Sequence, residues 1–336
     1  MATLVRRLRQ RRTTGKVVDT RTGGETRGQV KVGWFGTDAK GAFLTNGAYD
    51  WTLSVTPADG VGAPVTASGT VQLFGAAPAR HDCIGGGDAL GDLLTLSTSG
   101  TLAFRQGLGK GTFSTKVGSS TGWATANKVL PFGDLSGDRC NDMLVRLNSG
   151  ALRAYKPNCY GTLEPSTAYT SLGTSGWNQY DVLTTPGDIS GDGRPDLIAR
   201  NTATGTVYLY KGTSTGKLSA RVKLYANWKT YKKVVGAGDL NGDGIGDLLA
   251  QDKANNLYRY YGKGNGTFAA RVKVAANWGA TYNVVVGVGD ITGDGRADLV
   301  ARDTAGNLYR QNGTGKGSFA ARVKIATGWQ GYKGIF

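Results

Sequence analysis

The sequence predicts an all-β protein that consists mainly of repeats of about fifty residues. Glycine supplies 54 of the 336 residues and breaks the chain into short segments, which is typical of strands joined by turns. A short acidic frame, followed at once by an apolar run, returns in successive repeats. Tryptophan keeps the same period, at positions 123, 177, 228, 278 and 329. A period of this length with about four short strands per repeat favours a β-propeller over a β-solenoid.

The order of segments within a repeat predicts how the ring closes. Each repeat reads as an acidic loop, three strands separated by glycine turns, a tryptophan, and a strand that leads into the next loop. The last residues, 332–336, match the leading strand at 231–235 but have no repeat of their own. We therefore expect residues 82–336 to form five four-stranded blades, closed by the C-terminal strand in the first blade. A ring of seven blades is the alternative.

The acidic frame is the strongest candidate site. Asp188, Ser190, Asp192 and Asp196 place oxygen-bearing side chains at positions 1, 3, 5 and 9 of a loop with glycine at position 6, a pattern that can surround a hard cation such as calcium. The other explanation is a set of Asx turns, in which aspartates accept hydrogen bonds from backbone N–H groups. The equivalent positions are Asp134, Ser136, Asp138 and Asp142; Asp239, Asn241, Asp243 and Asp247; and Asp290, Thr292, Asp294 and Asp298. The first repeat keeps three acids, at Asp82, Asp88 and Asp92, with altered spacing.

The segment before the repeats is organised differently. Residues 1–15 are rich in arginine and are expected to form a disordered basic tail. Residues 16–74 alternate apolar and polar side chains, which predicts a small β domain with strands at 16–19, 29–34, 47–56 and 65–73. Residues 75–81 are the expected linker. The chain shows no apolar run long enough to span a membrane and no apolar segment typical of a signal peptide.

The net charge of +16 has two interpretations. Basic residues recur in phrases such as Arg221-Val222-Lys223, which is typical of a solvated outer strand. They could also form a surface that binds a polyanion or nucleic acid, although no nucleic-acid motif accompanies them. Cys140 and Cys159 lie in one repeat, and we expect a local disulfide, with two free thiols as the alternative; Cys83 then has no partner.

Aromatic residues offer a second candidate site. The pairs Trp177 and Tyr180, Trp228 and Tyr231, Trp278 and Tyr282, and Trp329 and Tyr332 recur once per repeat. Such rings could stack on the faces of sugars, or they could pack between blades. Catalysis has little support, because His81 is the single histidine and the repeated acids are assigned to the loops.

Two resemblances to known families add to this interpretation. Phe132-Gly133-Asp134, Pro186-Gly187-Asp188, Gly289-Asp290 and the segment 238–244 resemble FG-GAP/VCBS repeats, the blades of integrin-like propellers that are common in secreted actinobacterial proteins. This resemblance spans residues 82–336 and implies calcium at Asp188, Asp192, Asp196 and their equivalents. The segments 15–18 and 46–53 resemble the Ig-like domain of flagellar hook capping proteins, which implies a partial β-sandwich at 16–74.

Together these observations predict a function in binding. We expect a monomeric, calcium-stabilised, non-catalytic adhesion or binding module that acts outside the cell and takes a glycan or a protein as its ligand. A purely structural appendage of a longer secreted enzyme is the alternative, and a surface for polyanions is a weaker one.

Overall fold

The computed structural model describes residues 2–10, 17–24, 33–37, 44, 47–57, 59, 61–73, 79–85 and 87–336. The chain divides into two compact units, Met1–Ala77 and Pro78–Phe336. The linker expected at 75–81 overlaps this division, but only residues 79–81 of it lie within the described part.

The first unit contains an antiparallel sheet. Its strands are β1 (Ala2–Gln10), β2 (Val17–Gly23), β3 (Gly47–Pro57) and β4 (Val65–Leu73), in the order β2-β1-β3-β4. The strands expected at 47–56 and 65–73 are β3 and β4, and the one expected at 16–19 begins β2. Of the strand expected at 29–34, only residues 33 and 34 are described, and they lie outside any strand. The described strands of this unit form a single sheet, so they do not show the two layers of a sandwich.

The basic N-terminal segment differs from its expectation. Residues 2–10 are not irregular but form strand β1, which pairs antiparallel with β3 from Ala2 opposite Pro57 to Gln10 opposite Tyr49. The physical reason is backbone pairing, because β3 uses only one of its edges for β4 and the other is open to a strand. The rest of the expected tail, residues 11–15, lies outside the described residues.

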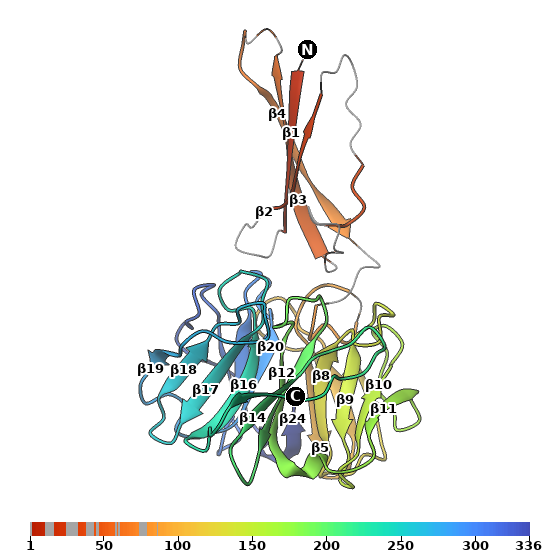
Figure 1. Ribbon diagram of the computed structural model, residues 1–336, viewed down its shortest axis with the longest axis vertical. Helices are drawn as coiled ribbons and strands as arrows, with labels where there is room; N and C mark the ends of the chain where they lie inside the picture. The colour runs from red at the N-terminus through yellow and green to blue at the C-terminus, as the bar shows by residue number, and fades with distance from the viewer. Residues whose placement is uncertain are drawn as a thin grey trace. The chain divides into compact units, whose positions relative to one another are not determined.

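The second unit is a β-propeller, and residues 87–336 form its five four-stranded antiparallel sheets (Figure 1). We number the blades in chain order, and each is given from its inner to its outer strand. Blade 1 contains β24 (Tyr332–Ile335), β5 (Leu93–Ser97), β6 (Leu102–Arg105) and β7 (Gly118–Ser120); blade 2 contains β8 (Lys128–Gly133), β9 (Asp142–Arg146), β10 (Leu152–Tyr155) and β11 (Tyr169–Gly173); blade 3 contains β12 (Tyr180–Gly187), β13 (Asp196–Asn201), β14 (Val207–Tyr210) and β15 (Val222–Tyr225); blade 4 contains β16 (Tyr231–Gly238), β17 (Asp247–Asp252), β18 (Leu257–Tyr260) and β19 (Val272–Ala275); and blade 5 contains β20 (Tyr282–Gly289), β21 (Asp298–Asp303), β22 (Leu308–Gln311) and β23 (Val323–Ala326).

The ring closes within blade 1, as the sequence predicts. Strand β24, from the end of the chain, pairs antiparallel with β5, with Ile335 opposite Thr95. Phe336 and Leu94 also exchange two backbone hydrogen bonds, of 2.9 and 3.0 Å. The five-bladed ring is therefore confirmed, and its first blade contains strands from both ends of the repeat region.

The apolar run after each acidic loop explains why the second strand of a blade is the most buried. In β13, Leu197, Ile198 and Ala199 have no exposed surface, because the strand is covered on both faces by neighbouring blades. The outer strand β15 lies at the other extreme, with Val222 49% exposed. The repeated basic phrases thus belong to outer strands that face water.

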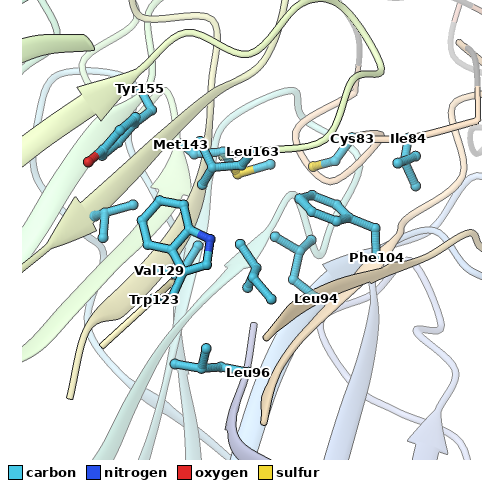
Figure 2. Packing of buried hydrophobic residues seen from close by; sticks show 12 residues of the cluster. Cys83, Ile84, Leu94, Leu96, Phe104, Trp123, Val129, Met143, Tyr155 and Leu163 are labelled. Carbon is cyan, nitrogen blue, oxygen red and sulfur yellow. The ribbon is translucent and has the colours of Figure 1, made fainter. Parts of the chain in front are cut away.

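Side chains from neighbouring blades pack together between the sheets. Figure 2 shows Leu94 and Phe104 of blade 1 packed near Met143 and Tyr155 of blade 2, with Trp123 among them. All of these side chains are buried. Four further clusters follow the same principle around the ring, so that the core of this unit is divided among the blade interfaces.

Candidate functional site

Each acidic loop joins the inner strand of a blade to the strand beside it. In blade 3 the loop runs from Asp188, directly after β12, to Asp196, the first residue of β13. Asp188 Oδ1 accepts hydrogen bonds from the N–H groups of Ser190 and Gly191, and Asp188 Oδ2 accepts one from Gly193. Gly193 has a φ of 82°, so glycine suits position 6 for a conformational reason. The aspartate at position 1 thus folds the loop around itself.

The aspartate at position 9 holds the loop to the sheet. Asp196 Oδ2 accepts hydrogen bonds from Ile189 and Ser190, at 3.0 and 2.9 Å, and Oδ1 accepts one from Gly212 after the third strand, at 3.1 Å. Asp92 and Asp298 accept the same three hydrogen bonds. Asp247 accepts two of them, from Leu240 and Gly262, while the N–H of Asn241 bonds to Asp239 instead. These buried carboxylates join three parts of each blade.

Burial also raises the pKa of these carboxyl groups. For Asp196 the pKa rises to about 6, mainly because the side chain is removed from water and also because Asp188 lies nearby, while three backbone N–H groups oppose the shift. Burial raises the pKa of Asp247 to about 7, with further contributions from Asp239 and Asp243. Loops that concentrate acids in this way carry electrostatic repulsion that a bound cation would relieve.

Blade 2 lacks one of the three contacts. Its position 9 residue, Asp142, is 1% exposed and accepts hydrogen bonds through Oδ2 from Leu135 and Ser136. Its Oδ1 has no hydrogen-bond partner among the described residues, and neither has Ser136 Oγ. The position that should supply the third N–H is Pro157, which has no backbone hydrogen to donate. This loop therefore contains a buried carboxylate oxygen that is open to another partner.

Blade 1 contains a longer version of the same loop. Ala89 N–H bonds to Asp82 and Leu90 N–H bonds to Asp88, which are the contacts made by positions 6 and 7 in blade 3. Ala89 has a φ of 62°, the left-handed conformation that glycine adopts at position 6 in blades 3, 4 and 5 and that Arg139 adopts in blade 2. The acids with altered spacing thus occupy positions 1, 5 and 9, and the inserted residues lie between the first two.

The loops also contact one another around the ring. Gly246, at position 8 in blade 4, donates its N–H to the carbonyl oxygen of Asp188 in blade 3 at 3.1 Å, and Gly91 donates to Asp290 in the same way at 2.6 Å. Glycine turns add a second link, since Gly266 of blade 4 donates to Ile189 of the blade 3 loop at 2.7 Å. The acidic loops are therefore also joints between neighbouring blades.

The oxygens of these loops match the chemistry that calcium requires. Carboxylates, the Ser190 hydroxyl and backbone carbonyls are hard ligands, and a carboxylate oxygen bonded to an N–H group keeps a second lone pair. However, within the described part of the chain no three acidic, histidine or cysteine side chains are close enough together to hold a metal ion as they stand. The structure thus shows the hydrogen bonds expected of Asx turns, together with a donor set that suits calcium.

The aromatic pairs that recur in the sequence lie between blades. Trp177, Tyr180, Trp228, Tyr231, Trp278 and Tyr282 are each at most 9% exposed and belong to the hydrophobic clusters, while Trp329 and Tyr332 pack against another cluster. Arginines bind several of the hydroxyl groups; Arg271, for example, donates to Tyr231 Oη at 2.6 Å. This placement favours packing, and it leaves little ring surface for a sugar.

The cysteines of blade 2 lie together. A disulfide joins Cys140 to Cys159, whose Cα atoms are 4.8 Å apart, and it connects the acidic loop to the turn after β10. Cys83 is a free, buried cysteine in the cluster between blades 1 and 2. In the same region His81 is 3% exposed, so its imidazole is shielded from solvent.

A cavity of about 510 Å³ lies where the inner strands of all five blades meet. The polar side chains in its wall include Lys128, Asp181, Lys233, Asn283 and Lys333, and apolar side chains such as Val182 and Val284 lie among them. These polar residues stand at the beginnings of the inner strands, whereas the acidic loops follow the ends of the same strands. The sequence gives little sign of this site, because its residues are single positions spread over five repeats.

Contacts between blades fix the charged groups of this axial cavity. Lys128 Nζ donates to the carbonyl oxygen of Asp181 at 2.7 Å, and Lys233 Nζ donates to that of Asn283 at 3.1 Å. Arg200 binds both carboxylate oxygens of Asp181, at 3.0 and 2.6 Å, and this pairing helps to lower the pKa of Asp181. The acid in the cavity wall is thus neutralised within the protein.

Comparisons with known proteins agree with this architecture. Residues 188–250 and 239–301 match the model of the FG-GAP-like repeat. No curated protein matches the sequence. Among solved structures, the chain is similar to a symmetrical protein studied for its de novo evolutionary emergence, with 14% identity, coverage of 74% of this chain and 98% of that one, and a TM-score of 0.51.

Two lectins are also similar, at lower TM-scores. One is from Agrocybe aegerita and recognises non-reducing terminal N-acetylglucosamine, with 17% identity, coverage of 98% of this chain and 91% of that one, and a TM-score of 0.42. The other is BP39L from Burkholderia pseudomallei, with 12% identity, coverage of 95% and 99%, and a TM-score of 0.42. Likeness at this level does not bear on the ligand of this chain. Its repeats between residues 188 and 301 are FG-GAP-like, and they form part of a five-bladed β-propeller.

Proposed function

We propose that this chain is a non-catalytic binding module, that calcium stabilises its blades, and that a glycan binds in its axial cavity. The observation that carries the proposal is the cavity itself. Its volume of about 510 Å³ lies in the range of small-ligand pockets, and its wall contains amide, ammonium and apolar groups together. Sugars offer hydroxyl groups for hydrogen bonds and C–H faces for apolar contacts, so a wall of this composition suits them.

Calcium is assigned to the acidic loops on the basis of their donor set. In blade 3 the side-chain oxygens come from Asp188, Ser190, Asp192 and Asp196, and in the other blades they come from the equivalent residues. In blade 2 the unpartnered Asp142 Oδ1 and Ser136 Oγ support the assignment, because they are buried oxygens that a cation would satisfy. When bound, calcium would neutralise the acids of the loop, and the loops would in turn hold neighbouring blades together.

The proposal also includes that the protein is not an enzyme and that it acts outside the cytoplasm. The repeated aspartates accept backbone hydrogen bonds, so they are poorly placed to transfer protons to a ligand. The single histidine, His81, is among the residues that line the cavity, but only 3% of its surface is exposed. We place the protein in an oxidising compartment outside the cytoplasm, in agreement with the disulfide between Cys140 and Cys159. Among the described residues, no helix is long and apolar enough to cross a bilayer.

Chelation tests the role of calcium. We expect the melting temperature to fall when calcium is removed with EGTA and to recover when calcium, but not magnesium, is added back. The variant Asp192→Asn should weaken this response, because it removes one carboxylate from the proposed calcium ligands. Asp192 is exposed and accepts one backbone hydrogen bond, so the substitution itself should cost little stability in the absence of calcium. A melting temperature that is the same with calcium and with EGTA would contradict the role of calcium.

A glycan array tests the role of the cavity. Wild-type protein should capture a defined set of glycans, and Thr125→Trp should reduce this capture because Thr125 lines the cavity and a large ring there would narrow it. The matched control is Thr121→Trp, an exposed threonine four residues earlier that is not in the cavity wall. Equal capture by both variants would place the ligand elsewhere, and no capture by wild type would favour a structural appendage.

A further inference from the structure

The axial cavity has an excess of positive charge in its wall. Among the described residues that line it, four carry a cationic side chain, namely Arg80, Lys128, Lys233 and Lys333, whereas Asp181 carries the one acidic side chain. Arg200, which is not among the lining residues, already binds both oxygens of that carboxylate. Within the described part of the chain, the cationic side chains of the cavity thus form no ion pair with a carboxylate of their own.

Two of the lysines are held in position by the ring. Lys128 in β8 and Lys233 in β16 lie opposite Arg146 and Gln251, which are the equivalent positions of the second strands in blades 2 and 4. Each ammonium group donates one hydrogen bond to a carbonyl oxygen of the next inner strand, as described above, and keeps two further N–H groups. The lysine side chains are therefore anchored at the wall with donors to spare.

Electrostatic repulsion accompanies this arrangement. Burial lowers the pKa of Lys128, and Arg146 and Arg200 lower it further. Burial likewise lowers the pKa of Lys233, with a contribution from Lys232. Positive groups gathered in a partly enclosed space destabilise one another, and a negative ligand would remove that cost.

We propose that the axial cavity binds a small ligand through an oxyanion group, namely a carboxylate, sulfate or phosphate, held by Lys128, Lys233 and Lys333. This inference rests on the proposed function and narrows its ligand to an acidic sugar. Asn283, at the start of β20, lies in the same wall and can bond to sugar hydroxyls. Ammonium groups are compact charges without a preferred planar geometry, so they can bind any of the three oxyanions.

Isothermal titration calorimetry with small probes tests the proposal on the full chain. The probes are glucuronate, inorganic sulfate and neutral glucose, because a long polyanion would also bind to the basic exterior of a protein with a charge of +16. We expect glucuronate to bind more tightly than glucose, and its affinity to fall about tenfold or more in the double variant Lys128→Gln/Lys233→Gln. Binding of sulfate alone would indicate a site for a free inorganic anion, which would overturn the assignment to an acidic sugar.

The matched control is the double variant Lys223→Gln/Lys273→Gln, which removes the same charge from exposed lysines of the outer strands β15 and β19. Equal losses of affinity in the two double variants would show a general effect of net charge and overturn the proposal. If the cavity variant fails to fold, Lys333→Gln serves instead, because Lys333 is exposed and lies at the same cavity. Cavity-dependent capture of neutral glycans without any preference for glucuronate would refute the oxyanion site but leave the proposed function standing; no binding of any sugar would refute both.

Discussion

At the scale of single residues, blade 2 shows how one substitution changes the environment of a buried acid. Pro157 takes the place of the glycine whose N–H reaches the position 9 aspartate in the other blades, so Asp142 Oδ1 is left without that bond. Asparagine at position 9 would keep an oxygen for the two loop N–H groups, and its NH2 group would then face the position of the third N–H group. In blade 3 that amide would meet the N–H of Gly212, whereas in blade 2 it would meet no donor.

We therefore expect Asp196→Asn to destabilise the protein more than Asp142→Asn, by about 1–3 kcal/mol in the free energy of unfolding. Urea denaturation in the presence of EGTA measures both, so that loss of a calcium ligand does not contribute. Equal costs for the two variants would show that the third hydrogen bond adds nothing to the stability of blade 3.

At the scale of elements, the acidic loop has two roles, because it turns the chain and also contacts the next blade. Gly246 illustrates the second role. A Cβ atom at this position would collide with the carbonyl oxygen of Pro186 in blade 3, although the backbone conformation itself is open to other residues. The close approach of this loop to the end of β12, rather than a special φ angle, requires glycine here.

The variant Gly246→Ala should consequently lower the free energy of unfolding by about 1–3 kcal/mol, because backbone atoms must move apart. Gly331→Ala is the control, since a Cβ atom there would have nothing within 4 Å. Chemical denaturation of the two variants side by side provides the comparison, and a stable Gly246→Ala protein would mean that the loops are not tightly joined.

The sequence predicts the elements better than it predicts the sites. The period of the tryptophans and the apolar runs after each Asp frame determine the blades, because every repeat carries the same signal. The loop of blade 1 is harder to recognise, since inserted residues separate Asp82 from Asp88 and Ala89 replaces the usual glycine. Periodicity also cannot distinguish an exposed aromatic ring from a buried one, and the burial of Tyr231 depends on the blade beside it.

The axial cavity could not be predicted from the sequence for a related reason. Lys128, Lys233 and Lys333 are not conspicuous among forty basic residues, and they come together only when the ring closes. Blades 3 and 5 carry Val182 and Val284 at the position of Lys128 and Lys233, and Lys333 stands one position earlier in its strand, so no motif marks the three lysines. The basic phrases that attract attention in the sequence, such as Arg221 to Lys223, instead lie on outer strands.

At the scale of the whole molecule, the contact between β24 and β5 closes the ring of the propeller. Ile335 is 5% exposed and packs with Leu93 and Val288, so its side chain joins blade 1 to blade 5. We expect Ile335→Ala to cost about 2–5 kcal/mol, as is typical of a large core side chain. Val222→Ala in the outer strand β15 is the control and should cost less than about 1 kcal/mol, because Val222 is half exposed. Thermal melts of both variants measure the difference, and equal melting temperatures would argue against a ring that depends on closure.

The pairing of β24 with β5 also imposes an order on folding during synthesis. Strands β5, β6 and β7 leave the ribosome first among the blades, yet the inner strand of their sheet is made only after the other four blades. Until then, the inner edge of β5 carries unpaired backbone groups, and an exposed edge of this kind invites pairing with other chains. Blade 1 is thus the first blade to be translated and the last to be completed, which makes it the part of the nascent protein most in need of protection from aggregation.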